Sequence, residues 1–358
     1  MATYNITIIL PFFRKISGGY KIVCEYANRL AKKGHFVEIV LDCSDFIYNS
    51  RKYKLIPKSI KYAICLYYLT KIKKWYSVSK LVTIRCARKV NENTVNDGDV
   101  IIATAVSTAK EVAKLSNNKG KKIYFIQGYE AWGGWSEYQV NETYKLGMKN
   151  IVIAKWLQDK VSRAGAESVI LKNAIDTNVF YVKKNIDTRN KYNIAMMYRL
   201  EEVKGAKYGI KALGILKKKY PKLNAILFGP VSRPKLLPSW IKYEKNVNEK
   251  RLNEIYNEAS IYLYPAIKEG FGLTGAEAMA CGCAYVSSDY GGVHEYTVNG
   301  RNVLLSLPRD VNGLVKNVSY LIENDIERIN IAKAGVEDIK TLDWKNNIEK
   351  LEEIMESL

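Results

Sequence analysis

Hydrophobic residues along the first 45 positions alternate between short apolar runs and a helical pattern. Residues 4–10 are typical of a strand, and the loop that follows ends with the small residues 17–19. Residues 20–33 carry apolar side chains at helical spacing, and Gly34 is a residue that commonly ends a helix. A second strand is predicted over 35–41. Strand, helix and strand in this order predict a parallel sheet covered by helices.

The same alternation continues along the rest of the chain. Further short strands are predicted over 100–103, 122–126 and 150–153. A second series begins near residue 192, with strands 192–198, 223–228, 261–264 and 284–287 and helices 206–219, 249–258 and 274–281. The last stretch predicts a helix with Asp343 as its N-cap. Two α/β domains joined around 173–190 are the expected architecture.

Composition supports two folded domains in the cytoplasm. The 358 residues are 47% hydrophobic and 26% charged, a balance that lets both halves bury a core. No window approaches the roughly 18–20 apolar residues of a membrane span, and the first residues lack a secretory signal. The six cysteines are expected to be reduced and buried, and Cys281-Gly-Cys283 is too closely spaced for a zinc knuckle.

Positive charge is concentrated in the first half of the chain. The net charge is +20, and no acidic residue lies between Asp45 and Glu92. Segment 51–89 mixes lysines with apolar and aromatic residues, so we interpret it as a basic amphipathic segment that binds an anionic membrane surface. The alternatives are a solvated helix face and single-stranded nucleic-acid binding. No nucleic-acid motif occurs, and no nucleic-acid partner is expected.

The most informative stretch runs from Glu269 to Gly282. Two carboxylates, Glu269 and Glu277, flank a glycine-rich loop that leads directly into a predicted helix. Glycines allow close approach of a ligand to the backbone, and a helix start favours an anion such as phosphate. The alternative is structural, because Thr274-x-x-Glu277 is also a capping box.

Together with four other segments, this stretch resembles the Glu-x7-Glu signature of the retaining glycosyltransferases of family 4 (glycosyltransferase group 1), which have the GT-B fold. The other segments, in the family's order, are Ser17-Gly18-Gly19 with Gly34-His35, Asn173 to Phe180, Arg199 to Gly205, and Gly291 to Glu295. The resemblance covers most of the chain. It implies two Rossmann-like parallel-sheet domains facing a central cleft: 1–175 for the acceptor, 176–340 for the nucleotide sugar, and a helix 341–358 packing back on the first domain.

The resemblance also implies a role for each matching residue. Arg199 and Lys204 hold the donor diphosphate, and with Glu269 they are the predicted catalytic residues. Glu269 binds donor-sugar hydroxyls and Glu277 the ribose, whereas Glu295 tunes the donor loops. The remaining predicted donor-binding residues are Gly18, Gly19, Gly229, Phe271, Gly272, Leu273 and Thr274. Two fixed cations would offset the charge that grows on the leaving nucleoside diphosphate. For Lys204 alone, the alternative is a solvated basic loop.

One segment departs from the family pattern. Many relatives carry His-Asp after the strand at 122–126, where this chain has Gln127-Gly-Tyr129-Glu130-Ala-Trp132. We predict acceptor contacts for Gln127, Tyr129, Glu130 and Trp132, with a packed loop as the alternative. No metal is expected, because Asp97-Gly98-Asp99 fits a turn before the strand at 100–103.

The sequence therefore predicts a retaining, metal-independent hexosyltransferase without a cofactor. Its donor is expected to be a UDP-sugar, with dTDP- and GDP-sugars as alternatives. Its acceptor is expected to be a lipid-linked sugar or a surface polysaccharide at the inner face of the membrane. The competing functions are a nucleotide-sugar epimerase of the same fold and an inactive membrane or nucleic-acid adaptor.

Overall fold

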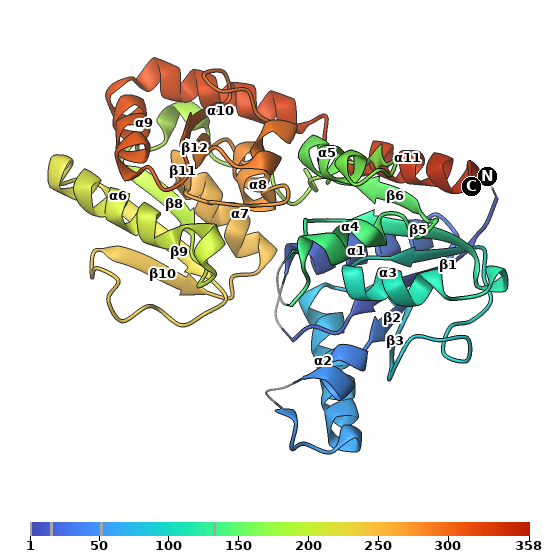
Figure 1. The fold of residues 1–358 in the computed structure, drawn as a ribbon. Helices are drawn as coiled ribbons and strands as arrows, with labels where there is room; N and C mark the ends of the chain where they lie inside the picture. The colour runs from blue at the N-terminus through green and yellow to red at the C-terminus, as the bar shows by residue number, and fades with distance from the viewer. Residues whose placement is uncertain (1, 15–16, 51–52, 132–133) are drawn as a thin grey trace. The chain divides into compact units, whose positions relative to one another are not determined.

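The computed structural model describes residues 2–14, 17–50, 53–131 and 134–358, and the chain divides into two compact units (Figure 1). Unit 1 comprises Met1–Lys172 together with Ile348–Leu358, and unit 2 comprises Asn173–Asn347. Each unit is built on its own parallel β-sheet flanked by helices. The predicted fold class, α/β with two Rossmann-like domains, is confirmed.

The sheet of unit 1 has the strand order β3-β2-β1-β4-β5-β6-β7. Its strands are β1 (Asn5–Pro11), β2 (Phe36–Asp42), β3 (Val82–Ala87), β4 (Val100–Ala103), β5 (Lys121–Ile126), β6 (Lys149–Val152) and β7 (Val169–Ile170). Neighbouring strands are parallel, with Ile8 of β1 opposite Ile39 of β2 and Ile102 of β4. All four residues of β4 are buried, as a central parallel strand requires.

Helices of unit 1 are α1 (Gly18–Lys32), α2 (Lys58–Trp75), α3 (Val106–Ala113), α4 (Glu137–Thr143) and α5 (Lys155–Arg163), and the end of α11 (Trp344–Glu356) also belongs to it. Short turns of helix lie at η1 (Asp45–Asn49) and η3 (Asn117–Lys119). The loop–helix boundary predicted at residues 19 and 20 is wrong, because α1 begins at Gly18. Ser17 is its N-cap and its hydroxyl accepts from the Tyr20 N–H at 3.3 Å.

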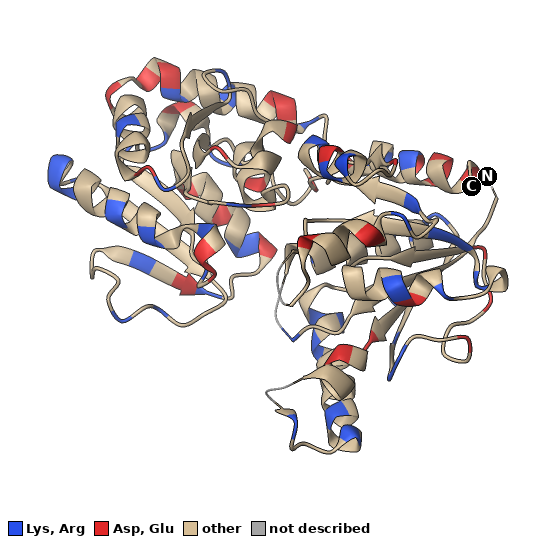
Figure 2. Ribbon diagram, in the orientation of Figure 1, with Lys and Arg blue, Asp and Glu red and all other residues tan. Residues whose placement is uncertain are grey.

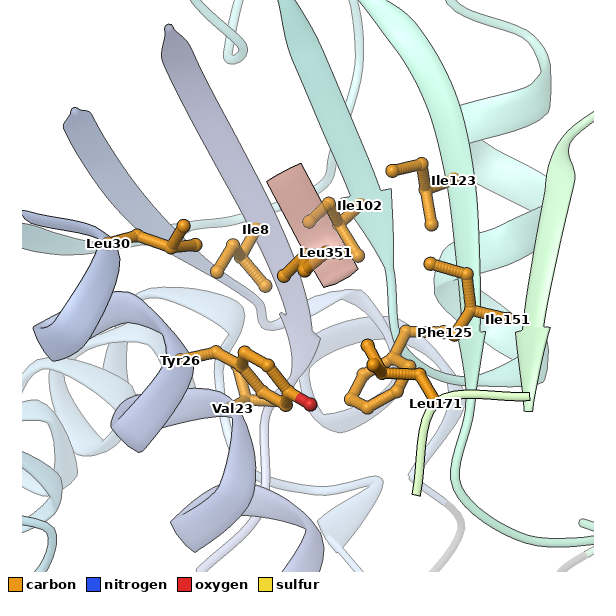
Figure 3. Close-up of a pocket in the computed structure, with 10 residues that line it drawn as sticks. All are labelled: Ile8, Val23, Tyr26, Leu30, Ile102, Ile123, Phe125, Ile151, Leu171 and Leu351. Atoms are coloured by element: carbon orange, nitrogen blue, oxygen red, sulfur yellow. The ribbon is translucent and has the colours of Figure 1, made fainter. Parts of the chain in front are cut away.

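Helices α1 and α11 pack on one face of this sheet and enclose a small apolar cavity (Figure 3). The cavity volume is about 20 Å³, which is room for about one water molecule. The residues around it come from the sheet, from the position directly after β7, from α1 and from α11. They are Ile8, Val23, Tyr26, Leu30, Ile102, Ile123, Phe125, Ile151, Leu171 and Leu351. An apolar space of this size is a packing defect of the core and no place for a nucleotide.

A buried carboxylate fastens α11 to the rest of unit 1. Glu352 is 5% exposed and pairs with Lys33 and with His35 Nε2, the latter at 3.0 Å. His35 Nδ1 accepts from the Tyr4 N–H at 3.1 Å, so in the neutral ring Nε2 carries the proton and donates to Glu352. The residues after 347 are therefore tied to the first strands of the chain.

The sheet of unit 2 has the strand order β10-β9-β8-β11-β12-β13. Its strands are β8 (Asn193–Met197), β9 (Asn224–Gly229), β10 (Ile241–Lys245), β11 (Ile261–Tyr264), β12 (Ala284–Ser288) and β13 (Val303–Ser306). Its helices are α6 (Ala206–Lys219), α7 (Glu249–Glu258), α8 (Leu273–Ala280), α9 (Val311–Glu323) and α10 (Asp325–Ile339), with short turns η4 (Ile186–Thr188), η5 (Glu202–Lys204) and η6 (Gly291–Glu295). Helices α6, α9 and α10 bury apolar side chains against the strands.

The basic segment 51–89 folds into α2 and β3, apart from residues 51 and 52, which lie outside the described residues. The prediction of an amphipathic segment is wrong in its geometry. Lys61 is buried, and its ammonium donates to the Ile47 carbonyl at 3.1 Å, whereas Ile60, Leu66 and Tyr67 are exposed. Apolar and basic side chains therefore share the outer surface of α2. Within the described part of the chain, no helix is both long enough and apolar enough to span a bilayer.

Candidate active site

The two central strands of unit 2, β8 and β11, are neighbours in the sheet although they are not consecutive in the chain. The strand order reverses between them, and ligands of open α/β sheets bind outside the carboxyl ends of the strands at such a point. The loops 198–205 and 265–272 leave the sheet here. They are joined directly, because the N–H groups of Ile267 and Lys268 donate to the Val203 carbonyl at 2.7 and 3.1 Å.

Gly205 makes this close approach of the two loops possible. It has φ +66°, which disfavours other residues, and a Cβ at this position would overlap the Pro265 carbonyl. It also precedes the first residue of α6. The Lys204-Gly205 turn predicted from sequence therefore places Lys204 above the end of β11.

Lys204 forms an ion pair with Glu269, which lies on the second loop. The Tyr264 hydroxyl, at the end of β11, donates to Oε2 of the same carboxylate at 2.6 Å. The side chains of Lys204 and Glu269 are 21% and 19% exposed, so a ligand in solvent can reach both. Burial raises the pKa of Tyr264 well above its ordinary value, so the phenol stays protonated and donates.

Arg199 occupies the start of the first loop and binds a different carboxylate. Its Nε and Nη2 donate to the two oxygens of Glu201 at 3.2 and 3.1 Å, and its side chain is 19% exposed. The two cations thus come from one loop at the carboxyl end of β8, and a carboxylate holds each of them. A bound diphosphate would compete with Glu201 and Glu269 for these cations.

Helix α8 begins directly after the glycine-rich loop. Its N-cap is Gly272, with φ 92° and ψ 50°, and no side chain caps the helix. The capping-box alternative is therefore wrong, because Thr274 and Glu277 both lie inside the helix. The first N–H groups of a helix have no partner within it and attract anions. Phe271, Gly272, Leu273 and Thr274 therefore lie around a helix start, in the setting that the sequence predicted.

Glu277 lies below this surface. It is 4% exposed, and the Tyr256 hydroxyl donates to it at 3.5 Å. Gly229 ends β9 and is packed against the Tyr198 carbonyl, which a Cβ would overlap. Glu295 ends η6 and is 8% exposed. The predicted contacts of Glu277 with a ribose and of Gly229 with a donor remain predictions.

In unit 1 the strand order reverses between β1 and β4; Gly18 and Gly19 follow β1, and Gln127 follows β5, the neighbour of β4. Gly18 and Gly19 form the first turn of α1, and a Cβ on Gly19 would lie 3.3 Å from Oε1 of Gln127. Gln127, which stands after β5 where relatives have histidine, therefore lies directly against Gly19. Their roles toward donor and acceptor remain predictions.

Glu130 caps the N-terminus of α3, although it lies 24 residues away from that position in the sequence. Its Oε2 accepts from the Val106 N–H at 2.9 Å, at the first residue of the helix. Desolvation by the surrounding protein raises the pKa of Glu130 to about 7, although this hydrogen bond acts in the opposite direction. A carboxyl of this kind changes its charge near neutral pH.

Of the two aromatic residues in segment 127–132, the structure describes only Tyr129. Tyr129 is 2% exposed, its hydroxyl lies 3.4 Å from Asn141, and Lys160 covers its ring. The packed-loop alternative describes this ring, whose face is not open to a sugar. Trp132 lies outside the described residues.

The Asp97-Gly98-Asp99 segment precedes β4 and connects neighbouring loops. Asp97 pairs with Lys119 at 2.7 Å, and Asp99 accepts from the backbone N–H of Asn5 at 2.6 Å. No group of three or more His, Cys, Asp or Glu side chains able to hold a metal ion occurs in the described ranges. All six cysteines are described residues, buried and unbridged.

Sequence reasoning missed the tyrosines that support this site. Tyr264 contacts Glu269 directly, and the hydroxyls of Tyr290 and Tyr296 lie within reach of the carbonyls of Phe271 and Gly272. Their positions in the sequence could have indicated them. Tyr264 ends a strand at the carboxyl edge of the sheet, and Tyr290 adjoins the Gly291-Gly292 turn.

The second half of the chain is similar to known glycosyltransferases. Residues 180–338 match the model of the family described as Glycosyl transferases group 1. The D-inositol 3-phosphate glycosyltransferase of Corynebacterium urealyticum is 26% identical over 181 residues, 46% of this chain and 43% of that protein. The N,N'-diacetylbacillosaminyl-diphospho-undecaprenol alpha-1,3-N-acetylgalactosaminyltransferase of Campylobacter jejuni is 34% identical over 95 residues, 26% of this chain and 25% of that protein. The chain thus spans less than half the length of these relatives.

Similarity of fold extends over nearly the whole chain. The crystal structure of HepE from Anabaena in complex with UDP and glucose has a TM-score of 0.77, with 15% identity over 99% of this chain and 100% of that chain. This neighbour confirms the GT-B type of fold, and at that identity it is evidence of fold alone. The matched region contains the Lys204–Glu269 pair, Arg199 and the start of α8. Residues 180–338 therefore resemble the glycosyl transferases group 1, and the chain as a whole shares the GT-B type of fold.

Proposed function

We propose that this protein is a retaining, metal-independent hexosyltransferase of family 4, which moves a sugar from a nucleotide sugar to a lipid-linked or polysaccharide acceptor. The observation that carries the proposal is the joint presence of Arg199, Lys204 and Glu269 on the two loops at the strand-order reversal of unit 2. Cations suit a diphosphate, and a carboxylate suits sugar hydroxyls. Both are present at the one edge of the sheet where nucleotides commonly bind.

In this proposal the cations supply most of the catalysis. Charge grows on the leaving nucleoside diphosphate as the glycosidic bond breaks, and Arg199 and Lys204 offset it without a metal ion. Glu269 orients the sugar, Glu277 the ribose, and the start of α8 the phosphates. The leaving phosphate accepts the proton of the acceptor hydroxyl on the same face, so no protein nucleophile is required.

A UDP-sugar is the proposed donor, with dTDP- and GDP-sugars as the alternatives. Support for the uridine nucleotide comes from HepE, whose structure holds UDP and glucose on the same fold. A lipid-linked acceptor is supported by the Campylobacter relative, whose name specifies a diphospho-undecaprenol substrate. Such acceptors lie in a membrane, so the protein is proposed to work at the cytoplasmic membrane face.

The surface of α2 is suited to such a membrane. Figure 2 shows basic residues and no acidic residue along this helix. Lys58, Lys73 and Lys74 are exposed, and Leu66 and Tyr67 on the same helix are 43% and 57% exposed. Leu55 in the preceding loop is 98% exposed. Basic side chains attract anionic headgroups, and apolar and aromatic ones enter the interface between headgroups and acyl chains.

A calorimetric or thermal-shift screen of UDP, GDP, dTDP and their sugars tests the donor site, because a ligand of the folded state raises its melting temperature. At least one of these nucleotides is expected to bind. Binding of none would contradict the proposal. Incubation with the donor alone separates transfer from epimerisation, since an epimerase converts the sugar without an acceptor.

Vesicle sedimentation tests the membrane surface. Replacing Lys58, Lys73 and Lys74 with Glu should lower binding to anionic vesicles by at least about tenfold at low salt, since each lysine near such a surface contributes about 1 kcal/mol. The matched control replaces three exposed lysines of unit 2, Lys211, Lys218 and Lys250, with Glu. Equal binding of both triple variants would contradict a role for α2.

A further inference from the structure

Beneath the glycine-rich loop of unit 2 lies a cluster of buried tyrosines. Tyr264 and Tyr285 come from the neighbouring strands β11 and β12, and Tyr290 and Tyr296 flank η6. Their exposed fractions are 1%, 0%, 2% and 7%. The Tyr264 ring meets the Tyr290 ring edge to face at 5.7 Å, and Phe271 of the loop packs on Tyr296 at 5.1 Å. Packing thus holds these rings in place under the residues that the proposed function assigns to the donor.

Three hydroxyls of this cluster form a chain that ends on the loop. Tyr285 and Tyr290 are 3.1 Å apart, Tyr290 and Tyr296 are 3.0 Å apart, and Tyr296 donates to the Gly272 carbonyl at 2.9 Å. A phenol has one proton. Because Tyr296 uses its proton on Gly272, it accepts from Tyr290, whose other acceptor, the Phe271 carbonyl, is farther away at 3.5 Å. Tyr290 in turn accepts from Tyr285. Burial raises the pKa of Tyr290 and Tyr296 well above the ordinary value, so both stay neutral donors.

The loop has little room to take another path. A Cβ on Gly272 would overlap the Tyr290 hydroxyl, and a Cβ on Gly275 would overlap the Tyr285 hydroxyl. A Cβ on Gly292 would overlap the Gly270 carbonyl, so η6 presses on the same loop from its own side. The backbone at Gly272 and Gly275 therefore lies directly against tyrosine hydroxyls, and the backbone at Gly270 lies against η6.

The fourth hydroxyl acts on a side chain. Tyr264 donates to Oε2 of Glu269, the oxygen that also contacts Lys204. When a diphosphate draws Lys204 away, the bond from Tyr264 keeps Oε2 occupied and the carboxylate in its orientation. Oε1 is then the oxygen available to a hydroxyl of the donor sugar.

We propose that Tyr264 and Tyr296 are positioning residues of the donor site: Tyr264 orients the Glu269 carboxylate toward the sugar, and Tyr296, supported by Tyr290 and Tyr285, fixes the 271–272 backbone at the start of α8. This inference rests on the proposed function and deepens it. The two tyrosines act on different parts of one ligand, since Glu269 meets the sugar and the loop backbone meets the sugar and the phosphates.

The test compares Tyr264→Phe and Tyr296→Phe with Tyr220→Phe, a matched control that also loses a hydroxyl-to-carboxylate bond, to Glu323 on the surface of unit 2. Calorimetry gives the Kd of each variant for UDP and for UDP-glucose, or for the GDP or dTDP pair if the unsubstituted chain prefers it. Tyr264→Phe should raise the Kd for the nucleotide sugar about tenfold, which is the effect of losing one hydrogen bond to a charged group. The Kd for the diphosphate should stay within about twofold of that of the unsubstituted chain. Tyr296→Phe should raise both.

Hydrogen exchange in the free protein supplies a readout that needs no ligand. Tyr296→Phe should speed exchange of the backbone N–H groups of residues 271–276, and Tyr264→Phe and Tyr220→Phe should not. Equal effects of Tyr264→Phe on both ligands, or unchanged exchange in Tyr296→Phe, would overturn the inference and leave the proposed function standing. An unsubstituted chain that binds no nucleotide of the panel would overturn the proposed function and this inference together.

Discussion

Lys204 and Glu269 lie 65 residues apart in the sequence, and their side chains form an ion pair that joins the loops following β8 and β11. In the free protein the Glu269 carboxylate occupies the place beside Lys204 that a phosphate would take. Binding of a diphosphate must therefore open the pair. The two substitutions should therefore affect diphosphate binding and sugar transfer differently from each other.

Glu269→Ala should lower sugar transfer by about 100-fold or more while the nucleoside diphosphate binds as tightly as before, or more tightly. In the proposed function this carboxylate orients the sugar, so that role is lost, and Lys204 is released from its competitor. Initial rates and calorimetry with UDP measure the two effects. Parallel loss of transfer and of UDP binding would contradict this division of roles.

Lys204→Ala should weaken diphosphate binding about tenfold and transfer about 100-fold, because the charge that is proposed to stabilise the leaving group is removed. Tyr264 still holds Glu269 in this variant. The control is Lys207→Ala, since Lys207 is 62% exposed and pairs with Glu202 at 2.8 Å. If both lysine variants behaved alike, Lys204 would be a solvated surface residue.

Arg199→Ala should raise the Kd of the nucleoside diphosphate about tenfold and make it less sensitive to salt, since one charge–charge contact is removed. Titrations at several ionic strengths measure the slope. Arg301→Ala is the control, because Arg301 forms a similar two-point contact with Asp338 in the same unit, at 2.6 and 2.9 Å. An unchanged salt dependence in Arg199→Ala would place Arg199 outside the binding site.

Gly272→Ala should lower the free energy of unfolding by about 2 kcal/mol, because the site has φ +92° and its new Cβ overlaps the Tyr290 hydroxyl. Adding Tyr290→Phe should restore part of that loss by removing the overlapping oxygen. Gly214→Ala, in open space on α6, should instead raise stability by about 0.5–1 kcal/mol through helix propensity. Chemical denaturation measures the free energy of unfolding of all three variants. Additive effects of Gly272→Ala and Tyr290→Phe would contradict the overlap.

Glu130→Gln should stabilise the protein at pH 8 more than at pH 5. The pKa of Glu130 is raised from 4.5 to about 7 by desolvation, so between these values the folded state binds the extra proton. Stability contributed by that proton is present at low pH and is lost as the pH rises toward 7. Gln keeps an acceptor for the Val106 N–H and has no charge to desolvate. Melting temperatures across this pH range, with exposed Glu356→Gln as control, should show the difference growing with pH.

Local patterns predicted most elements of the fold. Strands 100–103 and 261–264 and helices 206–219 and 249–258 have the predicted bounds, since apolar periodicity and glycine or proline punctuation mark them locally. Helix α2 does not have the separate apolar and basic faces of the predicted amphipathic segment, because Ile60, Leu66 and Tyr67 are exposed on it. Which face of a helix is buried depends on the sheet beside it, and local spacing does not contain that information.

The candidate site was predictable in its residues and unpredictable in its contacts. Arg199, Lys204 and Glu269 stand in recognisable motifs. The Lys204–Glu269 pair, in contrast, forms because β8 and β11 are adjacent strands in the sheet although they are not consecutive in the chain. Tyr264 is one of 26 tyrosines, and only its position at the end of a strand distinguished it. A tyrosine that ends a strand is usually core, and its hydroxyl acquires a role only through the loop that folds over it.

The order of residues in unit 1 has a consequence for synthesis of the chain. Unit 2, Asn173–Asn347, is continuous, whereas unit 1 needs Ile348–Leu358 to place Leu351 and Glu352 against strands made at the very beginning. Domains usually fold in the order in which the ribosome releases them. Here the later-made unit has all of its residues first, whereas the sheet of the earlier-made unit lacks the part of its cover beside α1 until translation has passed residue 347.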